Sequence, residues 1–365
     1  MSDVAGVIAS GVDGPLDDSA FDELARSTFA AQFEACAPYR SYCERRGRTP
    51  GTVRHWTEIP AVPQAAFKDA ELYSDTGAPA RVFETSGTTV GRPGRHLLST
   101  RGLALYEASM RATFHHFVLP EIEGRSVLAP ICLAPSSEEA PRSSLSFMID
   151  GVCRTFCAGE PARVVRGGKL HVDVLRAALA RAEGDGRPAL LLGTSLAFLD
   201  ACDGLEGSYE LPSGSRLMET GGDKGRKRAV GREELRERLA ATFGLAETAI
   251  VNEYGMTEAC SQFYEATLRG GARELAGPPW ARALLCDPET LEPSKPGETG
   301  VVRLVDLANR YSVSFVLTED LAIAASPGAH GPGSAPFRLL GRASGAEARG
   351  CSLAAEEWTR ATAGA

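Results

Sequence analysis

The most distinctive stretch of the sequence is Thr85-Ser86-Gly87-Thr88-Thr89-Val90-Gly91-Arg92-Pro93-Gly94-Arg95-His96. Seven of its twelve residues are Gly, Ser or Thr, and Arg92, Arg95 and His96 add basic groups. Glycines let the backbone approach a ligand closely, and hydroxyl and backbone N–H groups donate hydrogen bonds to phosphate oxygens. The stretch lacks the Gly-Lys-Ser/Thr of a Walker A loop and the spacing of a dinucleotide fingerprint. We interpret it as a polyphosphate-binding loop, although a solvated turn rich in small polar residues would be the first choice if the loop stood alone.

Composition and charge exclude several classes of protein. The chain has 365 residues, 43% of them hydrophobic, and a formal net charge of −8, which indicates a globular protein of two or three compact units. Without a basic block, nucleic acid is not the expected partner. There is no apolar run long enough for a membrane span, and residues 1–18 lack the features of a signal peptide. Nine scattered cysteines predict reduced thiols in a cytoplasm, with Cys153 and Cys157 as buried thiols rather than metal ligands.

Hydrophobic periodicity predicts alternating helices and strands in the first three quarters of the chain. Helices are expected over residues 21–45, 100–117, 175–182 and 232–243. Short apolar strands are expected at 125–134, 188–193, 214–219 and 248–253. This alternation favours an α/β domain with a mainly parallel sheet. After about residue 270, short runs at 300–305, 312–317 and 337–340 predict a small β subdomain.

Two further segments are expected to lack regular structure. Residues 59–63 contain paired prolines and should form an extended connector towards the polar loop. Residues 327–335 are rich in Gly, Pro and Ala and are the best candidate for a mobile loop.

Four motifs occur in an order that is typical of one enzyme superfamily. They are Thr85-Ser-Gly-Thr-Thr-Val-Gly-Arg-Pro93, Tyr254-Gly-Met-Thr-Glu258, Thr318-Glu-Asp-Leu321 and Gly341-Arg342. In this order they resemble the adenylate-forming superfamily of acyl-CoA synthetases and luciferases. Each motif is weak alone, but four in order are a strong signal.

The chain more closely resembles the LuxE-type acyl-protein synthetases, and phenylacetate–CoA ligases are more distant relatives. The matching residues are Phe67-Lys68, Phe83 to Thr89, Gly221-Gly222 with Lys224, Asn252 to Glu258 with Gln262-Phe263-Tyr264, and Arg349-Gly-Cys-Ser-Leu353. The likeness covers about residues 21–357. It implies a large α/β domain with layered, mainly parallel sheets and a small β subdomain, with the superfamily's C-terminal domain essentially absent.

The predicted division has four ranges. They are a helical segment at 1–80, an α/β core that binds ATP and the acid at 81–268, a small β subdomain at 269–345 and a hinge-like tail at 346–365.

The resemblance implies ATP-dependent activation of a carboxylic acid. The carboxylate attacks the α-phosphorus of ATP, pyrophosphate leaves, and a nucleophile then takes the acyl group from the acyl-adenylate. Such chemistry depends mainly on positioning and charge stabilisation. The implied cofactors are ATP and Mg²⁺, with CoA added if the product is a thioester. The implied partners are a small carboxylic acid and, for a LuxE-like enzyme, an acyl-accepting or carrier protein.

The resemblance also implies roles for individual residues. Thr257 would contact the α-phosphate and Glu258 would bind Mg²⁺, which prefers carboxylate and phosphate oxygens. Asp320 would hold the ribose hydroxyls, although Glu319 stands where relatives more often have glycine. The phosphate contacts would come from Thr85, Ser86, Gly87, Thr88, Thr89, Gly91, Arg92 and Arg95. The adenine contacts would come from Gly221, Gly222, Tyr254 and Gly255.

Several of these assignments have a plain structural alternative. Glu258 could be a carboxylate at the start of a helix, and Lys224 could be a solvated lysine in a charged run. A pocket for the acid would use Ser143, Ser144, Gly193, Thr194 and Ser195. An ordinary core explains these residues equally well. The acid itself cannot be deduced from the sequence.

The end of the chain departs from the superfamily pattern. Superfamily members continue after the hinge with a domain whose lysine promotes adenylation, but no lysine follows Lys295 here. Either Arg342, Arg349 or Lys224 replaces it, or adenylation is slower. Cys351 matches the cysteine that carries the acyl group in LuxE-type enzymes, and it also fits a small buried residue at the hinge.

Two other functions remain open at this level. One is a ligase that makes a CoA thioester, ester or amide of a small aryl acid. The other is a non-catalytic nucleotide-binding protein. Neither the final acyl acceptor nor the oligomeric state can be deduced from the sequence.

Overall fold

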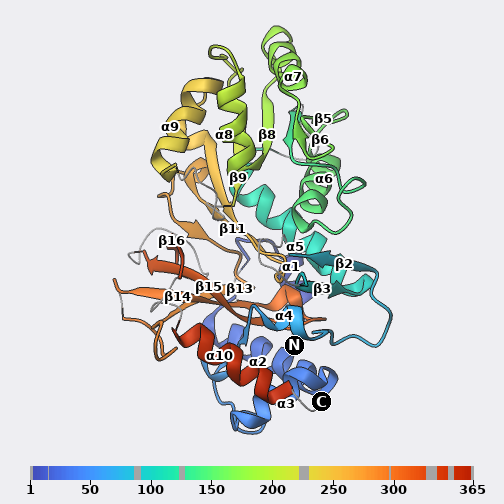
Figure 1. Ribbon diagram of the computed structural model, residues 1–365, viewed down its shortest axis with the longest axis vertical. Helices are drawn as coiled ribbons and strands as arrows, with labels where there is room; N and C mark the ends of the chain where they lie inside the picture. The colour runs from blue at the N-terminus through green and yellow to red at the C-terminus, as the bar shows by residue number, and fades with distance from the viewer. Residues whose placement is uncertain are drawn as a thin grey trace. The chain divides into compact units, whose positions relative to one another are not determined.

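The computed structural model describes residues 3–14, 16–85, 92–122, 128–221, 230–295, 297–325, 335–343 and 349–362. The chain forms two compact units, coloured by residue number in Figure 1. Unit 1 comprises Met1–Thr113, Met256–Gln262 and Ala276–Ala365, and unit 2 comprises Phe114–Gly255 and Phe263–Leu275. The four predicted ranges differ from these units because each unit is assembled from segments that are distant in the sequence. Most of the candidate mobile loop at 327–335 lies outside the described residues.

Unit 2 is built on a mainly parallel sheet, which agrees with the predicted fold class. Its strand order is β5-β4-β8-β9-β10-β11, with β11 antiparallel to β10. The strands are β4 (Ala129–Leu133), β5 (Ala162–Arg163), β8 (Ala189–Thr194), β9 (Arg216–Thr220), β10 (Ile250–Tyr254) and β11 (Phe263–Glu265). A short hairpin joins β6 (Val165–Arg166) and β7 (Lys169–Leu170).

Helices cover both faces of this sheet. They are α6 (Ser144–Phe156), α7 (Val172–Gly184), α8 (Ser195–Gly204) and α9 (Arg232–Phe243), with short 3₁₀ turns at η2 (Glu247–Ala249) and η3 (Thr267–Arg269). Figure 1 shows α8 and α9 on one side of the strands and α6 on the other. The predicted helix over 232–243 is confirmed. It ends at Gly244, whose φ of 61° is a left-handed conformation that favours glycine.

The sheet of unit 1 is mainly antiparallel. It contains β13 (Ala281–Cys286), β14 (Thr299–Asp306), β15 (Phe315–Ala324) and β16 (Phe337–Arg342), and β1 (Val62–Pro63) pairs in parallel with β15. A separate hairpin joins β2 (Arg81–Glu84) and β3 (Arg95–Leu98). The predicted small β subdomain therefore exists, but it also includes a strand from the N-terminal part of the chain. β12 (Leu275–Ala276) lies at the chain boundary of the two units.

Helices from both ends of the chain pack together in unit 1. They are α1 (Val4–Ala9), α2 (Asp18–Ala35), α3 (Ala37–Arg45), α4 (Ala66–Asp69) and α10 (Arg349–Thr362), with η1 (Trp56–Glu58) and η4 (Leu307–Asn309); α5 (Thr100–Val118) crosses into unit 2. The Tyr42 and Trp358 rings lie 5.4 Å apart and join α3 to α10. The range expected to be a hinge-like tail is therefore a packed helix over Arg349–Thr362.

Within the described residues, no helix combines the length and apolar character needed to cross a bilayer.

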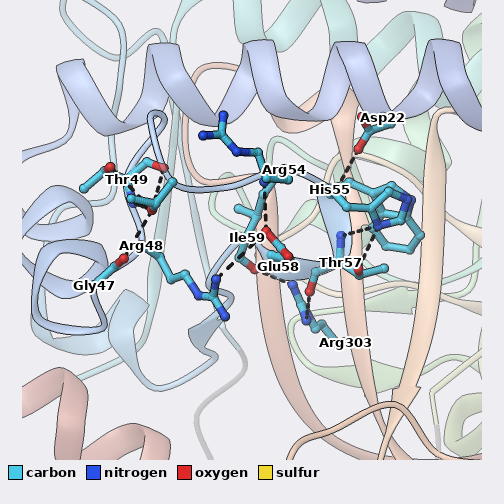
Figure 2. Close-up of polar contacts among 12 residues, drawn as sticks. Asp22, Gly47, Arg48, Thr49, Arg54, His55, Thr57, Glu58, Ile59 and Arg303 are labelled. Carbon is cyan, nitrogen blue, oxygen red and sulfur yellow. Dashed lines mark hydrogen bonds and ion pairs between the residues drawn. The ribbon is translucent and has the colours of Figure 1, made fainter.

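The connector before the polar loop is held at nearly every residue, as Figure 2 shows for its first part. Arg303 of β14 donates from Nη1 to the Thr57 carbonyl at 2.9 Å and from Nη2 to the Ile59 carbonyl. The hydroxyl of Tyr39 donates to the Pro60 carbonyl at 2.8 Å. The extended connector expected from the paired prolines ends in the short strand β1, and the carbonyls that precede this strand find side-chain donors in unit 1.

Candidate functional site

The described ends of the polar loop follow β2 and precede β3 in unit 1. Its base is closed by two hydrogen bonds, from Thr85 N to the Gly94 carbonyl and from Gly94 N to Thr85 Oγ1, each 2.9 Å. A Cβ at Gly94 would lie 3.1 Å from Thr85 Cγ2, so the closure favours glycine. Residues Ser86, Gly87, Thr88, Thr89 and Gly91 lie outside the described residues. The described part of the loop is thus a hairpin end with a tight base.

The basic residues of this loop are arranged differently from one another. Arg92 is exposed. Arg95 Nη2 lies 2.5 Å from Glu71 Oε1 in an ion pair whose two side chains are largely exposed. His96 is fully buried, with Nδ1 2.7 Å from the Thr257 carbonyl and Nε2 2.8 Å from Asn309 Oδ1. Burial lowers the pKa of His96 to about 4, although its contacts with Asn309 and Thr257 raise it, and the ring is held inside unit 1 against the Thr257 backbone.

Glu258 is buried in unit 1, at the end of the Tyr254–Glu258 motif. Its side chain is 2% exposed, and its Oε1 accepts a hydrogen bond from Gln64 Nε2 at 2.9 Å. Burial raises the pKa of the Glu258 carboxyl, whereas the Gln64 hydrogen bond and the charge of Arg342 lower it and the charge of Asp320 raises it. Glu258 lies in a turn between β10 and β11 and not at the start of a helix, which argues against the helix-start alternative.

Asp320 and Arg342 face each other across two neighbouring strands. They are paired residues of β15 and β16, and Arg342 Nε lies 3.6 Å from Asp320 Oδ1. Arg342 Nη1 lies 3.6 Å from Glu319 Oε2. Glu319 lies within extended β15, so the glycine found there in relatives is not required for the local backbone. Unit 1 therefore brings Glu258, Asp320 and Arg342 together from three separate motifs.

The remaining predicted nucleotide residues belong to unit 2 or lie outside the described residues. Tyr254 ends β10 and packs on Phe263, with ring centroids 6.2 Å apart, and Gly255 follows it and is exposed. Gly221 has a φ of 93°, and its carbonyl accepts a hydrogen bond from Ser195 Oγ at 2.8 Å. Gly222 and Lys224 lie outside the described residues.

The residues predicted to line an acid pocket have structural functions in unit 2. Ser143 Oγ caps α6 by accepting from Ser146 N at 3.1 Å, and Ser144 is the first residue of that helix. Thr194 Oγ1 caps α8 by accepting from Ala197 N at 3.2 Å. A Cβ at Gly193 would lie 2.7 Å from Leu133 Cβ, so close strand packing explains this glycine. The geometry favours the ordinary-core alternative for Ser143, Gly193 and Thr194.

A group of buried carboxylates at the ends of β9 and β10 was missed by sequence reasoning. Glu219 accepts hydrogen bonds from Ser195 Oγ and, at 2.6 Å, from Asn252 Nδ2. Glu253 accepts from Thr220 Oγ1, and burial raises its pKa to about 7. Each glutamate stands at the end of an apolar strand run in the sequence. This position could have marked both residues as buried carboxylates.

Cys351 is a packed thiol in α10. It is 7% exposed, packs with Val301, Leu317 and Leu321, and donates from Sγ to the Thr318 carbonyl at 3.4 Å. Burial raises the pKa of this thiol to about 11, so the reactive thiolate is scarce at neutral pH. An acceptor role for Cys351 would require α10 to move away from β15.

All nine cysteines are free, and the predicted burial of Cys153 and Cys157 is confirmed. Cys132 Sγ and Cys153 Sγ lie 3.6 Å apart. No group of three or more His, Cys, Asp or Glu side chains suited to a metal occurs among the described residues.

Comparison with known proteins agrees with the motif order. Residues 182–359 match the family model described as acyl-protein synthetase, LuxE. The predicted resemblance to LuxE-type acyl-protein synthetases is confirmed. Among characterised proteins, the long-chain-fatty-acid–luciferin-component ligase of Aliivibrio fischeri is 24% identical to this chain over 309 residues, covering 83% of this chain and 78% of the relative.

Solved structures show that the fold of this chain is similar to that of adenylate-forming ligases. A 2-hydroxyisobutyryl-CoA ligase complex with 2-HIB-AMP and CoA has a TM-score of 0.64 and 15% identity, covering 89% of this chain and 68% of that chain. ATP-bound MatB from Rhodopseudomonas palustris has a TM-score of 0.52 and 17% identity, covering 73% of this chain. The alignment with MatB spans 49%, about half, of that protein's length.

Proposed function

We propose that this chain is an ATP-dependent ligase that activates a carboxylic acid as an acyl-adenylate and transfers the acyl group to a nucleophile, as a LuxE-like acyl-protein synthetase. The observation that carries the proposal is the convergence of Glu258, Asp320 and Arg342 in unit 1. Sequence motifs alone do not require these side chains to meet. The LuxE match over residues 182–359 and the fatty-acid ligase relative support the same reaction.

The proposed steps balance without another reactant. A carboxylate oxygen bonds to the α-phosphorus of ATP while the bond from that phosphorus to the pyrophosphate oxygen breaks. The acceptor nucleophile then bonds to the acyl carbon, and AMP leaves with the oxygen that linked it to that carbon. Positioning and charge stabilisation are the main contributions that a protein makes to such steps.

The residues of unit 1 fit a nucleotide bound with Mg²⁺. Asp320, 18% exposed at its side chain, would accept hydrogen bonds from the ribose hydroxyls. Arg342, 58% exposed at its side chain, would offset phosphate charge in place of the superfamily's lysine. Thr257 would contact the α-phosphate. The phosphate loop that begins at Thr85 would hold the distal phosphates.

Mg²⁺ fits Glu258 on chemical grounds. Mg²⁺ takes hard oxygen ligands and is usually bound by one or two carboxylates together with substrate phosphates and waters. Glu258 supplies a buried carboxylate, and the Gln64 side-chain oxygen beside it is buried without a hydrogen-bond partner. The ion would stabilise negative charge on the phosphates, and Glu258 would hold it.

The surroundings of the reaction follow from the same proposal. The nine free cysteines fit a reducing cytoplasm. An acyl-accepting or carrier protein is the proposed partner, because the matching family model describes acyl-protein synthetases. CoA is the alternative acceptor, in which case the product is a thioester.

A hydroxamate-trapping screen tests the proposal directly. Purified protein is incubated with ATP, Mg²⁺, hydroxylamine and single acids from fatty, aryl and amino acid panels, beginning with long-chain fatty acids. We expect acid-dependent hydroxamate together with acid-dependent pyrophosphate release. If no acid gives either product while ATP still binds, the protein is a non-catalytic nucleotide-binding protein instead.

A further inference from the structure

Gln64 lies at the end of the connector that precedes the polar loop, and no motif of the sequence singles it out. Its backbone N–H donates to the Leu317 carbonyl at 2.9 Å, directly after the β1–β15 pairing of Pro63 with Leu317. Leu317 is followed by Thr318, Glu319 and Asp320 on the same strand. The strand pairing thus places Gln64 beside the segment that carries Asp320.

The connector is held so that Gln64 has a defined position. Figure 2 shows Arg303 reaching Thr57 and Ile59, and Arg48 and Arg54 around Glu58. Trp56 N donates to Asp22 Oδ1 at 2.7 Å. After these contacts, the hydroxyls of Tyr39 and Tyr42 donate to Pro60 and Ala61, at 2.8 and 3.3 Å. These contacts and the β1–β15 pairing hold the backbone that leads into Gln64, which lies in the turn directly after β1.

The two ends of the Gln64 amide are used differently. Nε2 donates to Glu258 Oε1 at 2.9 Å, whereas the amide oxygen Oε1 is buried and has no hydrogen-bond partner. A buried carbonyl oxygen without a partner costs free energy, and a group bound beside Gln64 would remove that cost by donating to it. The unpartnered oxygen lies on the side chain that holds the proposed metal carboxylate.

We propose that Gln64 is a positioning residue for the divalent cation, orienting the Glu258 carboxylate through Nε2 and accepting a hydrogen bond from a cation-bound water through Oε1. This inference rests on the proposed function, because the cation would enter with the nucleotide. Mg²⁺ keeps several of its waters in protein sites, and those waters need acceptors. Residues that hydrogen-bond to metal ligands commonly change metal affinity by about 10–100-fold when they are removed.

His96 supports the same dipeptide from a different element. Its Nδ1 lies 2.7 Å from the Thr257 carbonyl, while Gln64 holds the side chain of Glu258. The Phe67 ring, three residues after Gln64, packs edge-on against His96 at 6.0 Å. His96 therefore positions the backbone of the motif and Gln64 positions its carboxylate.

Mn²⁺ binding measured by electron paramagnetic resonance, in the presence of α,β-methylene-ATP, tests this role without turnover. Gln64→Leu should weaken Mn²⁺ binding by about tenfold or more. Gln262→Leu is the matched control, since Gln262 also has a buried Oε1 without a partner, while its Nε2 faces the Cys260 carbonyl at 3.5 Å rather than Glu258. The control should bind Mn²⁺ within about twofold of wild type.

A double-mutant cycle separates positioning from general loss of structure. Because Gln64 is inferred to act through Glu258, Gln64→Leu should have little further effect on Mn²⁺ affinity in a Glu258→Gln background. If Gln64→Leu does not fold, Gln64→Met, which keeps the length of the side chain and removes the amide, takes its place. Wild-type Mn²⁺ affinity in a folded Gln64 variant overturns the inference, and so does an equal loss in both backgrounds.

The inference and the proposed function fail in distinguishable ways. Acid-dependent hydroxamate formation by wild type, combined with unchanged Mn²⁺ affinity in Gln64→Leu, overturns the role of Gln64 alone. Absence of both hydroxamate formation and nucleotide-dependent Mn²⁺ binding in wild type overturns both.

Discussion

Glu253 and Glu258 lie five residues apart in one motif, and both are buried, yet the charged groups around their carboxylates differ. Glu258 of unit 1 has an amide donor, the nearby charge of Arg342 and an unpartnered oxygen beside it. Glu253 of unit 2 accepts a hydrogen bond from Thr220 Oγ1. The charge that acts on it is negative, from the carboxylate of Glu219. Burial alone raises the pKa of a carboxyl group, whereas a nearby cation favours its charged form. Burial raises the pKa of both carboxyl groups, but only for Glu258 does a nearby cation, Arg342, oppose that rise, which fits its proposed role in holding Mg²⁺.

The strongest way to break this comparison is Glu258→Gln. If Glu258 holds Mg²⁺, the substitution should lower the rate of adenylate formation by about 100-fold, roughly 2.7 kcal/mol of barrier. Hydroxamate formation at saturating acid measures the effect, and circular dichroism checks that the variant is folded. Equal rates for a folded variant and wild type would remove Glu258 from the site.

Glu253→Gln should change the pH dependence of stability instead. The pKa of Glu253 is raised to about 7 in the folded protein. Between the ordinary carboxyl pKa and pH 7, the folded protein therefore keeps the Glu253 proton, whereas the unfolded chain has lost it. This stabilisation is fully present at low pH and is lost as pH rises through 7. Relative to wild type, the variant should therefore gain about 2 kcal/mol of unfolding free energy between pH 5 and pH 8.

Urea denaturation at both pH values measures that gain. Adenylate formation at pH 7 serves as the control and should change little. A constant difference in stability between variant and wild type at pH 5 and pH 8 would show that Glu253 keeps an ordinary pKa.

Gly193→Ala sharpens the structural side of the comparison. A Cβ at this position would lie 2.7 Å from Leu133 Cβ and 2.8 Å from the Leu133 carbonyl oxygen. Overpacking of this kind costs about 1–3 kcal/mol, so the midpoint of urea denaturation should fall. Gly231→Ala is a suitable control, because a Cβ at Gly231 would meet no atom within 4 Å. Gly159→Ala is unsuitable, because the φ of 89° at Gly159 would strain any other residue. Unchanged stability with altered acid preference would support a pocket at Gly193.

The smallest expected effect is that of Cys351→Ser in unit 1. Replacing a packed thiol by a hydroxyl should cost about 1 kcal/mol of unfolding free energy and leave adenylate formation unchanged. Mass spectrometry of wild type with ATP and the activated acid, before and after hydroxylamine, tests acylation of the thiol. A hydroxylamine-labile adduct that is absent from Cys351→Ser would show that α10 moves and that Cys351 is an acceptor.

Local sequence determined much of the regular structure. The helix over Arg232–Phe243 and the strands β4, β8, β9 and β10 follow from hydrophobic periodicity, and glycine marks the end of each except β4. These signals act between neighbouring residues. The order of the four motifs determined the resemblance and pointed to Glu258, Asp320 and Arg342. The structure brings these three side chains together, and their roles remain proposals.

Only the tertiary structure decided which of the other polar residues are available for chemistry. Ser143 and Thr194 cap helices, His96 is buried between two acceptors, and Cys351 packs against β15. Gln64 gains its place because β1 pairs with β15, a contact between Val62 and Val316 that no local pattern encodes. The physical reason is that periodicity reports which face of an element is apolar, whereas hydrogen-bond partners depend on the register between strands distant in the chain.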